Sequence, residues 1–283
     1  MSDLIKNVSD TSIWVAHYRA IESQRADALF QDPYASILVG EHASSIEAIK
    51  SPVSKWTQWS VVIRTYIIDQ MIHALIARGV TTFLNAGAGL DSRPYRMRLG
   101  ENISWIEVDF PHVIEYKNQQ LGDIKPNCKL ERIGLDLSNR DSRQSVFARI
   151  AQKHSNIAVL TEGVLPYLTQ DQVSELSEDL THHPGFRYWI CEYISPKSYR
   201  YLKNKKRMKI LKNAPFQFYP EDWMGFFESR GWSLSDSQYY SEISESLGRP
   251  TPIPAYFKLF ELILGKQWAS QFKRMSGFLL WGR

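Results

Sequence analysis

The stretch NAGAGLD at residues 85–91 directly follows the apolar run VTTFL at residues 80–84. A short apolar run that ends in a glycine turn is typical of a buried strand, and the glycines let the backbone approach a ligand closely. Further apolar runs follow, and helical stretches separate most of them. Strands are predicted at residues 81–85, 103–109, 129–135, 158–162, 186–193, 232–238 and 275–281. This alternation favours right-handed βαβ units, so we expect an α/β protein with a mainly parallel sheet covered on both faces.

The chain before residue 80 has a helical pattern instead. Apolar residues recur there at three- and four-residue spacing, most clearly in residues 56–78, and the pattern ends at Gly79. A glycine just after the last periodic residue is a common helix C-cap. We therefore divide the chain into a helical segment, residues 1–79, and an α/β core, residues 80–283.

Residues 195–230 form a longer interval between strands than an ordinary connection. It contains two prolines, Pro215 and Pro220, and the aromatic residues Phe216, Phe218, Tyr219, Trp223, Phe226 and Phe227. We interpret this interval as an inserted lid. The alternative is that its aromatic residues pack against the core as a satellite cluster.

A basic segment at residues 197–212 lies inside this insertion and holds eight Lys or Arg residues and no acid. Without it, 26 basic and 30 acidic residues remain. The net charge of +4 therefore comes from this segment, and the rest of the chain is not basic. We interpret the segment as a solvated helix face or as a docking patch for an acidic partner, a carrier protein or an anionic substrate. Nucleic acid is not expected as a partner.

The composition is that of a globular protein, with 283 residues of which 43% are hydrophobic and 23% charged. The first ten residues lack the apolar core of a signal peptide, and the apolar stretches on either side of Arg64 are shorter than the roughly 20 residues of a membrane span. Cys128 and Cys191 lie outside any metal-ligand spacing, and acids and histidines form no such cluster. We expect a cytoplasmic protein without a membrane span, a disulfide framework or a metal site.

Acidic side chains follow four of the predicted strands: Asp91, Asp109, Asp136 (with Leu137 beside it) and Glu162. In an open α/β sheet ligands bind outside the carboxyl ends of the strands, so these acids are expected to line one site. Asp109 stands 20 residues beyond Gly89, where ribose hydroxyls need an acceptor. Taken singly, each acid also has a structural explanation, as a turn or helix N-cap residue, a loop acid or a buried hydrogen-bond acceptor.

The glycine turn decides between a dinucleotide and another nucleoside. Ser92 replaces the third glycine of the dinucleotide fingerprint, and Asp91 puts a carboxylate beside the turn. A carboxylate there repels a pyrophosphate but attracts an amino group or a sulfonium, and S-adenosylmethionine (SAM) carries both. The sequence therefore predicts a SAM site, with NAD as the weaker alternative.

Several blocks along the chain, in order, resemble the leucine carboxyl methyltransferase family, especially its bacterial small-molecule O-methyltransferase branch. The blocks are WVAHYRAIESQRADALFQDPYA (14–35), RTYIIDQ (64–70), NAGAGLDSRPYRM (85–97), WIEVDFPHVIEYK (105–117), GLDL (134–137) and TEGVLPYL (161–168). The resemblance implies a class I methyltransferase fold, Rossmann-like, with strand order 3-2-1-4-5-7-6 and an antiparallel seventh strand. It also implies that the N-terminal helices form a cap over the substrate.

The resemblance assigns roles to residues that match the family's motifs. Arg64 would pair with the methionine carboxylate of SAM, where a guanidinium fork suits bidentate binding. The other implied contacts are Gly87 and Gly89 with the methionine portion, Asp109 with the ribose, Asp136 and Leu137 with the adenine, and Glu162 with the amino group, Tyr167 packing nearby. Arg25 and Arg93 are weaker candidates for the same site.

The implied reaction is methyl transfer to a carboxylate or hydroxyl of a small, polyketide-like acceptor of secondary metabolism. A carboxylate nucleophile needs no general base, whereas a phenol or alcohol benefits from one. The candidates for such a base are Tyr18, Tyr167 and His112. Two alternatives stay open: carboxyl methylation of a protein C-terminus, and a SAM-binding partner protein without turnover.

Overall fold

The computed structural model describes residues 11–43, 52–202, 216–252 and 270–283. Seven strands form one sheet in the order β3-β2-β1-β4-β5-β7-β6. The strands are β1 (Thr82–Ala86), β2 (Ser104–Asp109), β3 (Lys129–Gly134), β4 (Ile157–Thr161), β5 (Phe186–Ile194), β6 (Ser233–Tyr239) and β7 (Ser276–Gly282). The predicted strands are confirmed, each boundary to within one residue.

The directions of the strands also match the expectation. The pairs β1–β2, β1–β4, β2–β3 and β4–β5 are parallel, and β7 runs antiparallel to both β5 and β6. The carboxyl ends of β1 to β5 therefore meet at one edge of the sheet, which is where ligands bind in this architecture. The predicted α/β class and strand order are confirmed.

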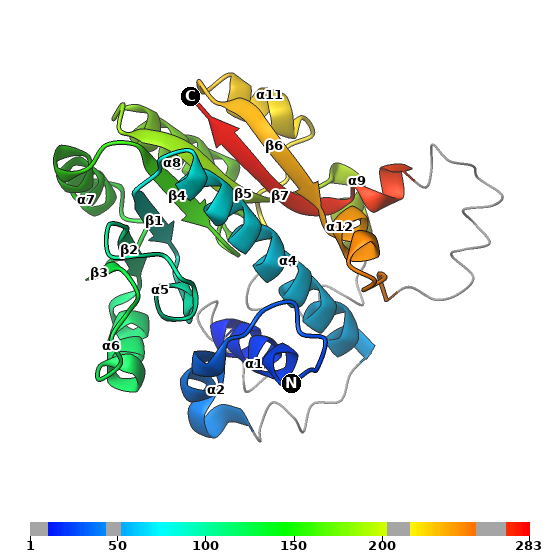
Figure 1. Cartoon of the computed structure of the whole chain (residues 1–283). Helices are drawn as coiled ribbons and strands as arrows, with labels where there is room; N and C mark the ends of the chain where they lie inside the picture. Colours follow the sequence, from blue (N-terminus) through cyan, green and yellow to red (C-terminus); the bar gives the residue numbers. More distant parts are fainter. Residues whose placement is uncertain (1–10, 44–51, 203–215, 253–269) are drawn as a thin grey trace.

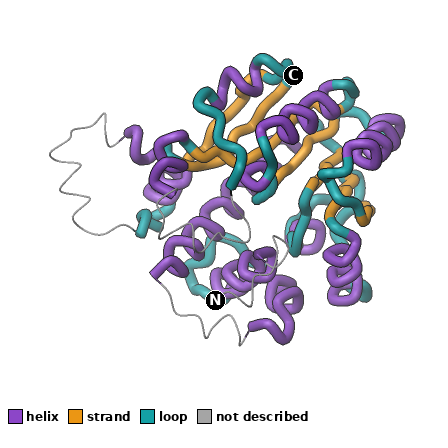
Figure 2. Tube along the Cα trace, turned by 180° about the vertical axis from the view of Figure 1, so that it is seen from behind, coloured by secondary structure: helices purple, strands orange, loops and turns teal. Residues whose placement is uncertain are grey.

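Helices cover both faces of the sheet (Figures 1 and 2). On one face lie α4 (Pro52–Ala77) and α12 (Tyr240–Ser246), and on the other α7 (Arg140–Lys153), α8 (Gln170–Thr181) and α11 (Trp223–Glu228). Successive strand residues point to opposite faces, so Phe83 packs with the α4 layer and Leu84 with the α7–α8 layer. The central strands are buried on both faces, which explains why β1, β4 and β7 read as nearly continuous apolar runs, whereas the edge strands β3 and β6 are polar and partly exposed.

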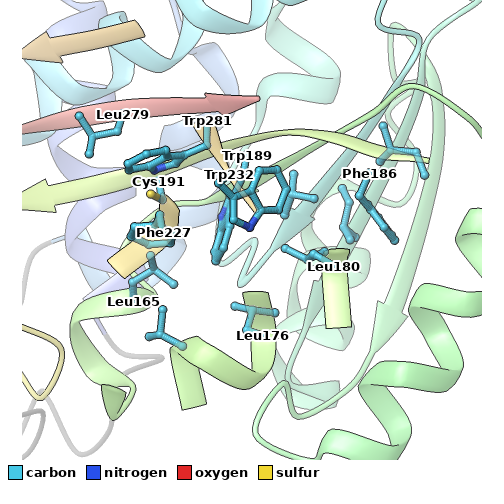
Figure 3. Packing of buried hydrophobic residues seen from close by; sticks show 14 of the residues in the cluster. Leu165, Leu176, Leu180, Phe186, Trp189, Cys191, Phe227, Trp232, Leu279 and Trp281 are labelled. Carbon is cyan, nitrogen blue, oxygen red and sulfur yellow. The ribbon is translucent and has the colours of Figure 1, made fainter. Parts of the chain in front are cut away.

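The second layer has an aromatic centre, drawn in Figure 3. Trp189 of β5 packs edge-on against Phe227 and Trp232, and Phe227 stacks on Trp281 of β7. Phe218, Trp223, Phe226 and Phe227 of the predicted insertion all belong to this core cluster. These four aromatic residues thus pack against the core, as the alternative interpretation of the insertion predicts.

The remaining part of the insertion is only partly described. Helix α9 (Pro196–Leu202) opens it, and residues 203–215, which hold most of the basic segment, lie outside the described residues. Tyr199 stacks on Tyr219, whose side chain is 40% exposed. The lid and the docking patch stay predictions.

Helix α4 combines length with an apolar composition. Its residues Lys55–Ala77 form the one helix in the described ranges that is long and apolar enough to cross a membrane. Ile63, Ile67 and Ile68 of this helix are fully buried against the sheet. Such packing is ordinary for the core helix of an α/β domain, and length and composition alone are weak grounds for a span.

The N-terminal helices α1 (Thr11–Ser23) and α2 (Pro33–Val39), with the short helix η2 (Gly40–His42), pack beside α4 and α6 (Pro111–Leu121). Their small core includes Ala16, Leu38 and Tyr95. Arg19 of α1 donates from Nη2 to the carbonyl oxygen of Leu90 at 2.6 Å. Because Leu90 belongs to the loop after β1, these helices lie against the ligand-binding edge of the sheet.

Candidate active site

The glycine turn after β1 is fixed from two sides. The N–H groups of Gly87 and Ala88 donate to the carbonyl oxygen of Val108 at 2.8 and 3.1 Å, which ties the turn to β2. Gly87 has a φ of +81°, and a Cβ there would lie 2.3 Å from Cγ2 of Val164 in the loop after β4. Only glycine satisfies both requirements, so the sequence fixes a close approach of the β1 and β4 loops.

Asp109 ends β2 and faces this turn. Its Oδ2 accepts from the N–H of Gly89 at 2.6 Å and its Oδ1 from the N–H of Phe110 at 2.7 Å. Burial raises the pKa of Asp109 despite these hydrogen bonds. The predicted contacts Gly87, Gly89 and Asp109 are thus brought together.

Phe110 was not predicted from the sequence. Its ring is 37% exposed and stacks on the ring of His112, with the centroids 5.7 Å apart. An exposed ring beside Asp109 offers a flat apolar surface. The signal in the sequence was its position directly after a strand-end acid.

Arg64 and Glu162 form an ion pair at the end of β4. Nε of Arg64 lies 2.9 Å from Oε1 of Glu162, and the two side chains keep 19% and 13% of their surface exposed. Burial would raise the pKa of Glu162, but Arg93 and Arg64 outweigh it and hold that pKa below its usual range. Glu162 is therefore an ionised carboxylate beside a guanidinium group.

Arg93 of α5 (Arg93–Arg96) connects this pair to the rest of the site. Its Nη1 donates to Glu162 Oε2 at 2.9 Å and to Asp91 Oδ2 at 2.7 Å, and its Nε donates to Asp69 Oδ1 at 2.7 Å. The side chain is 2% exposed. Arg25, the other weaker candidate, has 44% of its side chain exposed and pairs with Asp27 and Glu22 in α1 and the turn after it.

Asp91 follows the glycine turn, and Arg93 compensates its charge. Its Oδ1 accepts from the N–H of Arg93, and its Oδ2 accepts from Asn85 Nδ2 and Arg93 Nη1 at 2.8 and 2.7 Å. Burial opposes ionisation, but Arg93 holds the pKa of Asp91 well below its ordinary value. Asp91 therefore acts on the site through Arg93, which also binds Glu162.

Asp136 and Leu137 follow β3, two strands from β1. Asp136 is exposed, and its Oδ1 accepts from the N–H and Oγ of Ser138 at 2.9 and 2.8 Å. Leu137 is partly buried against the α7–α8 core, and Arg143 Nη1 donates to its carbonyl oxygen at 2.6 Å. Both residues lie on the β2–β3 side of the sheet edge, and Arg64 and Glu162 on the β4 side.

The three candidates for a general base belong to three different helices. Tyr18 is buried in α1 between Trp14 and His17, and burial raises its pKa. His112 lies exposed in the first turn of α6. Tyr167, in the short helix η3 (Leu165–Tyr167), packs edge-on against Phe216 and feels the charge of Arg64. Tyr167 is thus the candidate nearest the ion pair.

Glu192 near the end of β5 was missed by the sequence analysis. The residue is 5% exposed, its Oε1 accepts from the N–H of Val164 at 2.8 Å, and Arg64 and Glu162 both act on its charge. The available signal was a single acid near the end of a strand whose other residues, apart from Arg187, are apolar or aromatic. Among the described residues, no group of three His, Cys, Asp or Glu could hold a metal ion.

Comparisons with known proteins show the family of the chain. Residues 12–181 match the model of the family described as leucine carboxyl methyltransferase. A Mycobacteroides abscessus protein provisionally named an S-adenosyl-L-methionine-dependent methyltransferase is 30% identical over 282 residues, with 88% of this chain and 91% of that protein covered. A Frankia alni protein of the same provisional name is 26% identical over 261 residues, covering 86% and 90%.

Solved structures share the fold. A Thermobifida fusca protein provisionally named a methyltransferase has a TM-score of 0.56 at 15% identity, covering 95% of this chain and 94% of that one. Magnesium protoporphyrin IX methyltransferase (ChlM) from Synechocystis PCC 6803, with bound S-adenosylhomocysteine (SAH), has a TM-score of 0.51 at 15% identity, covering 83% and 88%. The fold is that of the class I SAM-dependent methyltransferases. Within that class, the chain belongs to the leucine carboxyl methyltransferase family.

The residues present fit the cofactor of this class. The methionine end of SAM is a zwitterion, and the ion pair of Arg64 and Glu162 presents the complementary pattern of a guanidinium beside a carboxylate. Asp109 supplies carboxylate oxygens for ribose hydroxyls, next to a turn that holds no Cβ at Gly87 or Gly89. Arg64 and Glu162 would hold the methionine end, and Asp109 the ribose.

Proposed function

We propose that the protein transfers the methyl group of SAM to an oxygen atom of a small acceptor. The observation that carries the proposal is the Arg64–Glu162 ion pair at the carboxyl end of β4, because it complements an amino-acid zwitterion. The family's bacterial small-molecule branch, which the sequence blocks resemble, supports an oxygen acceptor of secondary metabolism. When bound, SAM supplies a methyl group activated by its sulfonium.

The chain's own residues then have to orient the reactants and exclude water. Arg93 fixes the carboxylate of Glu162, so that this group does not reorganise when a ligand binds. The charge of Arg64 acts on the aromatic side chains of Tyr167 and Tyr240. These two rings favour an apolar acceptor next to the methionine end of the site.

Calorimetric titration with SAM and SAH, with NAD as the control ligand, tests the cofactor site. We expect Glu162→Gln to weaken SAH binding about 10- to 100-fold, the loss of one charge-assisted contact. Glu178→Gln is the matched control, because Glu178 is exposed on α8 and pairs only with the exposed Arg140 among the ion pairs described. Unchanged SAH affinity in Glu162→Gln, or a preference for NAD, contradicts the proposal.

Methyl transfer itself is tested with methyl-labelled SAM and a panel of phenols, alcohols and carboxylic acids. Label in a methyl ether or ester supports the proposed transfer to oxygen. Label on nitrogen or carbon contradicts it. Tight SAH binding without turnover on small compounds would favour a protein acceptor or a SAM-binding protein without turnover.

A further inference from the structure

Glu192 lies beside Glu162 at the ligand-binding edge. Cys191 of β5 pairs in register with Thr161 of β4, so Glu192 is one residue further along its strand, as Glu162 is along its own. The two strands are parallel neighbours, and both acids stand at their carboxyl ends. The position places Glu192 in the part of the sheet where acceptor and cofactor must meet.

The two oxygens of Glu192 differ in their surroundings. Oε1 accepts from the N–H of Val164, whose side chain contacts the position where Gly87 lacks a Cβ. Oε2 is buried and has no hydrogen-bond partner among the residues that the structure describes. A buried carboxylate oxygen without a donor costs about 1–3 kcal/mol, so such oxygens are normally filled by a ligand or water.

The groups around Glu192 come from four elements. Arg64 of α4 is the cation, Glu162 after β4 is a second carboxylate, and Tyr167 of η3 and Tyr240 of α12 are the titratable rings. Burial raises the pKa of Glu192 to about 7; hydrogen bonding and Arg64 oppose the shift, and Glu162 adds to it. A group with a pKa near the working pH is suited to exchange a proton during a reaction.

We propose that Glu192 accepts the proton of the methyl acceptor, and that the acceptor is therefore a phenol or alcohol and not a carboxylate. This inference rests on the proposed function. The acceptor's O–H bond breaks and its proton passes to Oε2 of Glu192, while the new O–C bond forms as the methyl–sulfur bond breaks. The carboxylate becomes a neutral acid as the sulfonium becomes a neutral thioether, so atoms and charge balance.

Charge also argues against a carboxylate acceptor. Such an anion would enter beside Glu162 and Glu192, and the nearby Arg64 is already paired with Glu162. Like charges in a partly desolvated cleft repel several times more strongly than in water. A neutral hydroxyl, by contrast, can donate to the unfilled oxygen of Glu192.

The first test needs no acceptor. The full chain is labelled at the glutamate side-chain carboxyl carbon, and the resonance of Glu192 is assigned by its loss in Glu192→Gln. We expect this carboxyl to titrate with a midpoint of about 7 in the protein without ligand. A midpoint at the ordinary value of 4.5 overturns the proposal.

The second test separates this inference from the proposed function. SAH affinity should be unchanged in Glu192→Gln, whereas Glu162→Gln weakens it. Equal losses in both variants would place Glu192 in the cofactor site and overturn its role as proton acceptor.

Turnover gives a further test. With any hydroxyl acceptor that turns over, Glu192→Gln should lower the rate about 100-fold or more and remove the rise of the rate with pH through about 7. A carboxylate acceptor methylated equally well by both proteins overturns the proposal, and where no compound turns over, the titration decides. Failure of the wild type to bind SAH would instead defeat the proposed function.

Discussion

At the scale of single residues, Arg93 joins three carboxylates through one guanidinium group. Asp69, Asp91 and Glu162 come from α4, the glycine turn and the end of β4, and each accepts from Arg93. A buried arginine is tolerated where such partners satisfy its charge and its donors. Arg93 therefore fixes the orientation of Glu162 before any ligand arrives. The sequence did not distinguish it from Arg25, because burial and partners depend on the tertiary fold.

The raised pKa of Glu192 should make the stability of the protein depend on pH. Its pKa of about 7 in the folded protein lies above the ordinary value of 4.5, so the folded state holds the proton more tightly than the unfolded state. As the pH rises from about 4.5 to about 7, the free energy of unfolding should therefore fall by about 3 kcal/mol on account of this residue, and then level off. Urea unfolding of the wild type and of Glu192→Gln over this range measures the difference.

The variant should lack this part of the decline, because glutamine carries no proton that dissociates. Glu178→Gln should follow the wild type, since Glu178 is exposed on α8. Parallel curves for the wild type and Glu192→Gln would show that the Glu192 carboxyl is not perturbed in the folded protein.

At the scale of elements, the strands were predictable and parts of the site were not. The central strands β1 and β4 are buried on both faces, so each forms a short apolar run that stands out from the polar helices α7 and α8. Glycine turns and strand-end acids mark the carboxyl ends, which located Gly87, Asp109 and Glu162. Glu192 is the one acid of β5, and the sequence of that strand does not reveal whether its carboxylate oxygens have hydrogen-bond partners.

The close approach of the β1 and β4 loops at Gly87 can be tested by adding a side chain there. Gly87→Ala should destabilise the protein more than Gly79→Ala and should weaken SAH binding, because the new Cβ would lie 2.3 Å from Cγ2 of Val164. Gly79 has a similar φ of +84° with nothing within 4 Å, so alanine there costs only the backbone strain, about 1 kcal/mol. Urea unfolding and calorimetry measure the two effects.

A double variant separates the clash from the backbone strain. Adding Val164→Ala removes the clashing Cγ2 and should restore part of the stability lost in Gly87→Ala. Equal destabilisation by Gly87→Ala and Gly79→Ala would mean that the β4 loop moves aside without cost.

At the scale of the whole molecule, the N-terminal helices are held to the site by buried polar contacts. Asp32 is the N-cap of α2, accepting from the N–H of Ala35 at 3.1 Å. Its Oδ2 also accepts from Arg19 Nε of α1 at 2.8 Å and from Ser92 Oγ in the loop after β1 at 2.6 Å. One carboxylate thus connects α1, α2 and the strand-end loop.

Asp32→Ala should therefore loosen α1 and α2 while leaving the sheet intact. We expect a loss of about 3 kcal/mol of stability, because the variant leaves Arg19 buried without its carboxylate and removes a helix cap. Hydrogen exchange should speed up in α1 and α2 and stay unchanged in β1 and β4. Asp27→Ala is the control, since its side chain is 64% exposed. Equal acceleration throughout the sheet would mean that these helices do not open independently.

The position of β7 has a consequence for protein synthesis. β7 is the last strand along the chain, yet it lies between β5 and β6, with Trp281 paired in register with Trp189. On the ribosome, β6 emerges before the strand that will join it to the sheet, and one edge of β5 stays open until residue 282 has been made. An open apolar strand edge invites pairing with other chains, so we expect the nascent chain to depend on chaperones until its final strand closes the sheet.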